Sequence, residues 1–113
     1  MGQAIARRLA GFRCQLLHAD PVIIDNQHNS RPVGIDDLFT RCDAVVVSAP
    51  LTPHTADMVG AEQLSASPPT PCSLNVGRGS VIDEDAVAAR PGLRIPGADA
   101  PDVFAFEDRA RPE

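Results

Sequence analysis

Residues 43–50 read Asp-Ala-Val-Val-Val-Ser-Ala-Pro, and this stretch decides the fold. Its middle part, 44–48, is apolar or small throughout and rich in β-branched side chains, with Asp43 and Pro50 as boundaries, which predicts a strand. A strand that does not alternate between apolar and polar residues has two apolar faces, and such strands belong inside parallel sheets covered by helices. The stretch therefore indicates an α/β protein.

The segments on both sides of this strand alternate between helical and extended patterns. Ile5 and Leu9, for example, recur at helical spacing opposite Arg7 and Arg8. We expect helices at 2–10, 35–39, 83–89 and, in two short pieces broken near Gly60, at 55–64; further strands are expected at 14–19 and 73–76. This order predicts a doubly wound parallel sheet of the Rossmann type.

Three segments fit regular structure badly. Residues 25–33 are polar and rich in turn formers, which predicts a surface loop. The segments 65–71 and 90–97 hold many of the 11 prolines. Proline removes a backbone donor and resists a helix interior or a central strand, so we expect both segments to be irregular.

Length and composition limit the possible partners. The chain has 113 residues, enough for one domain, and its 43% hydrophobic and 22% charged residues are typical of a soluble protein. The net charge of -5, with arginines scattered along the chain, argues against nucleic acid or a membrane as partner. Cys14, Cys42 and Cys72 lie far apart, which fits reduced thiols in the cytoplasm and makes a zinc site improbable.

Gly2 and Asp20 match the second half of a dinucleotide-binding fingerprint. Its third glycine lets a helix pack closely on a strand, and an acidic residue about 20 positions later accepts hydrogen bonds from the adenosine ribose. The first two glycines would precede Met1. An aspartate before a proline is more often a plain turn residue, so this pair alone leaves both interpretations open.

Two further groups of residues could take part in chemistry. Arg78 lies between Gly77 and Gly79, where its guanidinium is free to hold a carboxylate in two places; a solvated arginine in a flexible loop is the alternative. Asp102 can accept a hydrogen bond from a carboxamide, and Glu107 can orient a histidine. An acidic group near a chain end is also commonly just solvated.

Three stretches, 43–55, 75–84 and 102–108, together resemble the NAD-binding domain of the D-isomer-specific 2-hydroxyacid dehydrogenases. The resemblance covers nearly the whole chain, and within the family the chain looks closest to phosphonate (phosphite) dehydrogenase. It implies that residues 1–113 are a single, incomplete NAD-binding domain with the substrate domain absent.

The resemblance implies NAD as the cofactor. Gly2 would be the third glycine of the fingerprint, and Asp20 would hold the ribose and repel the additional phosphate of NADP. Pro50 and Leu51 would lie on the nicotinamide side. The other cofactor contacts that the resemblance implies are Val76, Arg78 and Asp102.

The implied catalytic residues are Arg78, which would grip an anionic substrate, and Glu107, which would pair with a catalytic histidine. We expect the chain to lack that histidine and therefore to show no dehydrogenase activity alone. His18, His28 and His54 precede Arg78 and are expected to be surface or strand-end residues. The alternatives are a non-catalytic nucleotide-binding module and a dimerisation module, with a homodimer as one possible assembly.

Overall fold

The computed structural model of the protein describes residues 1–23, 25–67, 72–89 and 99–101. Its helices are α1 (Gly2–Leu9), α2 (Ile35–Arg41), α3 (Ala61–Ala66) and α4 (Glu84–Ala88), with a 3-10 turn, η1, at Gly79–Val81. Its strands are β1 (Leu16–His18), β2 (Ser30–Pro32), β3 (Ala44–Val47), β4 (Cys72–Asn75) and β5 (Asp99–Pro101).

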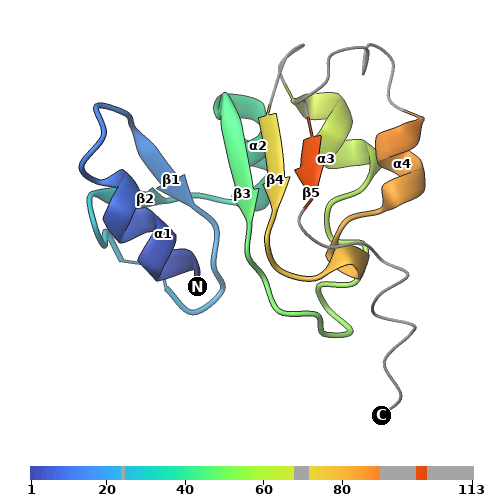
Figure 1. The fold of residues 1–113 in the computed structure, drawn as a ribbon, viewed down its shortest axis with the longest axis horizontal. Coiled ribbons are helices and arrows are strands. Elements are labelled where there is room, and N and C mark those ends of the chain that lie inside the picture. The colour runs from blue at the N-terminus through green and yellow to red at the C-terminus, as the bar shows by residue number, and fades with distance from the viewer. Residues whose placement is uncertain (24, 68–71, 90–98, 102–113) are drawn as a thin grey trace.

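All strand pairs in these residues are parallel. One sheet has the order β3-β4-β5, and β1 and β2 form a second sheet beside it. Helices flank the strands, and β1, β3 and β4 run in the same general direction (Figure 1). The predicted α/β class with a parallel sheet is therefore confirmed.

The hydrophobic core lies around β3. Val45 and Val47 are buried on this strand, and α2 and α3 contribute Phe39 and Leu64. Val59 and Val81, which lie beside each other through a backbone hydrogen bond of 3.1 Å, complete the buried cluster. α1 contributes no buried residue.

The pattern-based predictions hold for α1, α2, β3, β4 and α4, with ends shifted by a few residues. The predicted loop at 25–33 is wrong in part, because its last residues form β2. Ser30 is only 3% exposed there, and its hydroxyl lies 2.9 Å from Nδ1 of His18 on β1. Pairing with β1, rather than a local apolar pattern, therefore makes this strand.

The predicted helix at 55–64 is displaced. Thr55 closes a turn instead, its hydroxyl donating to the Pro50 carbonyl at 2.6 Å. α3 begins only after Gly60 and continues to Ala66, with the Ser65 hydroxyl donating to Ala61 at 2.6 Å. The first part of the expected irregular segment 65–71 is thus helical; the rest from 68 on, and the segment 90–97, lie outside the described residues.

Candidate functional site

Apart from Gly2, the sequence-predicted site residues that the structure describes follow the carboxyl ends of three parallel strands. Asp20 comes after β1, Pro50 and Leu51 come after β3, and Val76 and Arg78 come after β4. In open α/β sheets, ligands bind in the crevice outside these strand ends. Asp102 and Glu107 lie outside the described residues.

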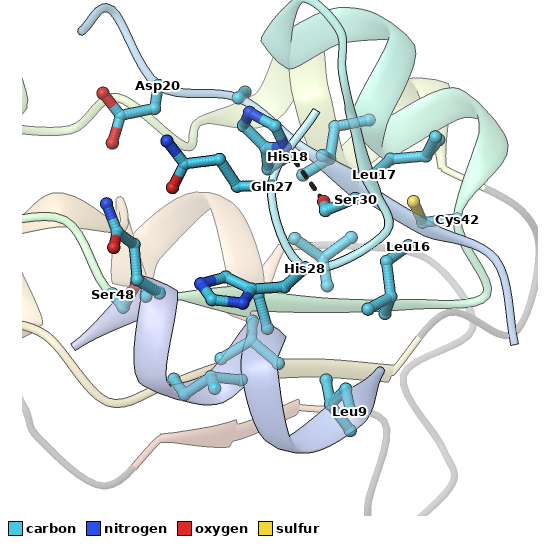
Figure 2. Close-up of a pocket in the computed structure, with 18 of the residues that line it drawn as sticks. Leu9, Leu16, Leu17, His18, Asp20, Gln27, His28, Ser30, Cys42 and Ser48 are labelled. Atoms are coloured by element: carbon cyan, nitrogen blue, oxygen red, sulfur yellow. Dashed lines mark hydrogen bonds between the residues drawn. The ribbon is translucent and has the colours of Figure 1, made fainter. Parts of the chain in front are cut away.

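A pocket of about 230 Å³ begins at this edge, and Gly2 is among the residues that line it. Asp20 and Ser48 also line it (Figure 2). Gly2 opens α1, and a Cβ added to it would lie 2.9 Å from Oγ of Ser48, just after β3. The start of α1 is therefore packed against the exit of β3, as the close-packing role of a third glycine requires.

Asp20 is both a turn residue and a pocket residue, so the two interpretations left open by the sequence are compatible. Its Oδ1 accepts hydrogen bonds from the backbone N–H groups of Val22 at 2.8 Å and Ile23 at 3.0 Å. The bond from Ile23, then that from Val22, lowers the pKa of the Asp20 carboxyl, with a smaller contribution from the charge of His18. Both bonds use Oδ1, so within the described part of the chain Oδ2 is open to a ligand.

His18 fixes the loop that carries Asp20. Its Nε2 donates to the Ile23 carbonyl at 2.9 Å, while Nδ1 faces the hydroxyl of the buried Ser30 at 2.9 Å (Figure 2). The carbonyl can only accept, so Nε2 carries a hydrogen in this contact. The loop is thereby tied to both β1 and β2.

The histidine predictions have mixed outcomes. His18 is a strand-end residue as expected, but it is half-buried and lines the pocket. His28 also lines the pocket and is not a plain surface residue, whereas His54 is exposed as expected. Sequence reasoning missed the pocket role because nothing local separates a histidine that faces a neighbouring strand from a solvated one.

The turn after β4 is fixed to the exit of β3. Asn75 is 2% exposed; its Nδ2 donates to the Arg78 carbonyl at 3.0 Å and its Oδ1 accepts from Gly77 N at 3.0 Å. A Cβ added to Gly77 would lie 2.6 Å from the carbonyl oxygen of Ala49. Only glycine therefore fits here, and the backbone N–H of Val76, which donates to the Val47 carbonyl at 3.0 Å, holds the turn against β3.

The remaining candidates differ in exposure. Arg78 is exposed, and its guanidinium makes a hydrogen bond to the neighbouring Gly77 carbonyl at 3.1 Å. Pro50 and Leu51 are exposed, with Leu51 at 39%, and Val76 is half-buried. Pro50, Leu51 and Arg78 are therefore open to solvent after the strand ends.

The structure thus gathers the candidates into two groups. Gly2 and Asp20 line the pocket beside Ser48, and Gly77 with Arg78 lies beside Ala49. The consecutive residues Ser48 and Ala49 join the two groups, a role that sequence analysis did not predict. The sequence signal for this role is the position of Ser48 and Ala49 directly after the most apolar strand.

No group of three or more metal-binding side chains occurs within the described ranges. The helices in that same part of the chain are all too short or too polar to cross a membrane.

Comparison with known proteins identifies what this arrangement resembles. The family model described as D-isomer specific 2-hydroxyacid dehydrogenase, NAD binding domain, matches residues 1–112. D-3-phosphoglycerate dehydrogenase of Mycobacterium bovis is 34% identical over 111 residues, covering 95% of this chain and 21% of its own length. Glyoxylate reductase of Thermococcus onnurineus is 36% identical over 112 residues, with 95% and 33% covered.

A solved structure shows the same fold. NAD-dependent formate dehydrogenase from Staphylococcus aureus in complex with NAD superposes with a TM-score of 0.83 at 30% identity, covering 97% of this chain and 33% of that one. The chain therefore spans between a fifth and a third of the length of these relatives. The names of these relatives do not support the expected likeness to phosphonate dehydrogenase.

Proposed function

Because the chain belongs to the D-isomer-specific 2-hydroxyacid dehydrogenase family, as its NAD-binding domain, we propose that it holds NAD along the strand ends described above. We further propose that it serves an oxidoreductase that moves a hydride between NAD and a small 2-hydroxy acid. NAD supplies the hydride chemistry when bound, and the residues of this chain bind and orient it.

The observation that carries the proposal is the placement of Gly2 and Asp20 in one pocket. Gly2 packs closely on Ser48 and lines the pocket at the start of α1, and N–H groups at a helix start favour phosphate. Asp20, with its lowered pKa, is ionised at neutral pH. Its free oxygen is suited to accept from the ribose hydroxyls of the adenosine and to repel a phosphate there.

The nicotinamide end is proposed to lie against Pro50, Leu51 and Val76, which follow β3 and β4. Arg78 follows next to it, and its exposed guanidinium fits a planar carboxylate. Phosphoglycerate, glyoxylate and formate, which the relatives' names give, are all carboxylates. Asp102 as the carboxamide partner and Glu107 as the partner of a histidine remain proposals that rest on the resemblance.

Titration of NADH fluorescence tests the cofactor site. We expect saturable binding that Asp20→Ala weakens by about tenfold, the loss of a charge-assisted hydrogen bond. Asp25→Ala is the control, since Asp25 is exposed in the same loop and does not line the pocket. Asp20→Ala should also reduce the preference for NADH over NADPH. Equal NADH affinities for the two variants would contradict the proposal.

Substrate binding is tested separately, by titrating glyoxylate into the NADH-saturated chain. Arg78→Lys should weaken glyoxylate binding by about tenfold, because lysine cannot form the paired hydrogen bonds of a guanidinium. NADH affinity serves as the internal reference. Arg31→Lys, at an exposed position on β2, is the matched control. Equal losses in both variants would remove Arg78 from the substrate site.

A further inference from the structure

The loop after β1 holds Asp20 by hydrogen bonds more than by packing. Asp20 is exposed, and its neighbour Val22 is 78% exposed. An exposed carboxylate samples several rotamers unless bonds restrict it, and this freedom is lost when a ligand binds. The N–H groups of Val22 and Ile23 restrict the Asp20 carboxylate before any ligand arrives. Its readiness to receive a ribose therefore depends on where Ile23 is held.

Ile23 links this carboxylate to His18. Its N–H donates to Oδ1 of Asp20 at 3.0 Å, and its carbonyl accepts from Nε2 of His18 at 2.9 Å. The N–H belongs to the planar peptide group before the Cα atom of Ile23, and the carbonyl belongs to the one after it. The two bonds therefore fix the chain on both sides of this residue.

His18 is itself held from two directions. Its backbone carbonyl accepts from the N–H of Val33 at 2.9 Å, just after β2. Its Nδ1 lies 2.9 Å from the hydroxyl of Ser30, a residue of β2 that is only 3% exposed (Figure 2). The ring thus has a fixed place on the paired strands, from which Nε2 reaches the loop.

We propose that His18 is a positioning residue that sets the preference of the chain for NADH over NADPH, by holding Ile23 and through it Asp20. This inference rests on the proposed NAD site at Asp20. The carboxylate can accept from the ribose hydroxyls and repel a phosphate only while it stays beside the pocket. Without the bond from His18, NADH loses part of this hydrogen bonding and NADPH meets less repulsion.

Two uncharged replacements of His18 separate the two ring contacts. In His18→Gln, the amide nitrogen can take the place of Nε2 and donate to the Ile23 carbonyl. In His18→Asn, the shorter side chain brings its amide only to the place of Nδ1, which keeps the contact with Ser30 and loses the donor to Ile23. The charge of His18, which also lowers the pKa of Asp20, is removed equally in both.

The first measurement is the ratio of the NADPH Kd to the NADH Kd, from fluorescence titrations of the full chain. His18→Gln should keep this ratio close to that of the original chain, and His18→Asn should lower it about fivefold, the loss of one hydrogen bond. The second measurement is carbon NMR of the Asp20 carboxyl. Its midpoint should lie closer to 3.8 in His18→Asn than in His18→Gln, because the bond from Ile23 is weakened.

The same replacement is then made in a chain that carries Asp20→Ala. A residue that acts through Asp20 has no effect once that carboxylate is gone, so His18→Asn should leave the ratio unchanged there. A general loss of folding would weaken both dinucleotides alike and would not produce this pattern.

The outcomes separate this inference from the proposed function. Equal ratios in His18→Gln and His18→Asn, while Asp20→Ala still lowers the ratio, would overturn the role of His18 and leave the NAD site intact. A fivefold fall that persists in the Asp20→Ala chain would also overturn it. A ratio that Asp20→Ala itself does not lower would overturn both proposals.

Discussion

Gly77 is the position where the turn after β4 touches the backbone of the segment leaving β3. A methyl group there would lie 2.6 Å from the Ala49 carbonyl oxygen. We predict that Gly77→Ala lowers the free energy of unfolding by about 1–3 kcal/mol, because backbone atoms must shift to admit it. Urea unfolding measures this change.

Gly34→Ala is the matched control, since a Cβ at Gly34 meets no atom within 4 Å and its φ is -71°. It should change stability by about 0.5 kcal/mol or less. Similar costs at the two glycines would show that the contact of Gly77 with Ala49 does not limit the turn.

Asp20 gives a prediction about pH. Its pKa in the folded chain lies below the ordinary value of 3.8, because backbone N–H groups of Ile23 and Val22 bind the ionised form. The stabilisation is complete above the unfolded pKa and is lost as the pH falls through the folded pKa. Carbon NMR of the Asp20 carboxyl should therefore show a midpoint below 3.8.

In the same titration, the protection factors of the Val22 and Ile23 amides, which are their exchange rates relative to an unfolded peptide at the same pH, should fall as Asp20 is protonated. Asp20→Asn keeps an acceptor but no charge, and it should remove this change in protection. A midpoint at or above the ordinary value would contradict the two hydrogen bonds.

Part of the site could be predicted from the sequence. Gly2, Asp20 and Arg78 sit in patterns whose spacing has a physical meaning. Asp20 and Arg78 follow strands, and Gly2 opens α1 beside Ser48. The contacts of Ser48 and Ala49 could not be predicted, because they depend on where α1 and the turn after β4 arrive in space. The residue types at 48 and 49 do not show which distant segments will contact them.

The helices differ in how much they contribute to the core. Leu64 of α3 is 3% exposed, whereas Leu9 of α1 is half-buried against an open pocket. We predict that Leu64→Ala costs about 2–5 kcal/mol of unfolding free energy. Leu9→Ala should cost about 1 kcal/mol or less, since little apolar area is lost and alanine favours a helix.

Chemical denaturation of the two variants under the same conditions checks this difference. If Leu9→Ala were as costly as Leu64→Ala, α1 would have to be packed into the core, contrary to its burial in the structure.

Helices and strands could be predicted where the sequence carries a local apolar pattern. β3 and α2 carry strong apolar patterns and were predicted. β2 is three residues long and reads Ser-Arg-Pro, so nothing local marks it as a strand; its partner on β1 and the His18 contact do. α3 was displaced because the Thr55 turn and the Gly60 boundary compete with the helical pattern.

The whole molecule has an uneven distribution of buried apolar residues. Every buried hydrophobic residue in the described part lies between 39 and 81, while α1, β1 and β2 form the other side of the molecule (Figure 1). We predict that amides of β1 and β2 exchange with solvent at least about tenfold faster than those of β3 and β4.

Exchange followed by mass spectrometry or NMR measures both groups in one sample. Uniform protection across β1 and β3 would mean that the two sheets open as one cooperative unit, which would contradict the prediction. The control is the same comparison under conditions where the chain unfolds globally, since the difference should then vanish.

The contacts at Ser48 and Ala49 have a consequence for how the sequence evolves. One dipeptide carries the helix start on one side and the glycine turn on the other. A bulkier residue at position 2 presses on Ser48, one at position 77 presses on both Ser48 and Ala49, and an insertion between 48 and 49 disturbs both contacts. These four positions should therefore be inherited as a set: across related sequences, substitutions at any of them should be rare and should occur together.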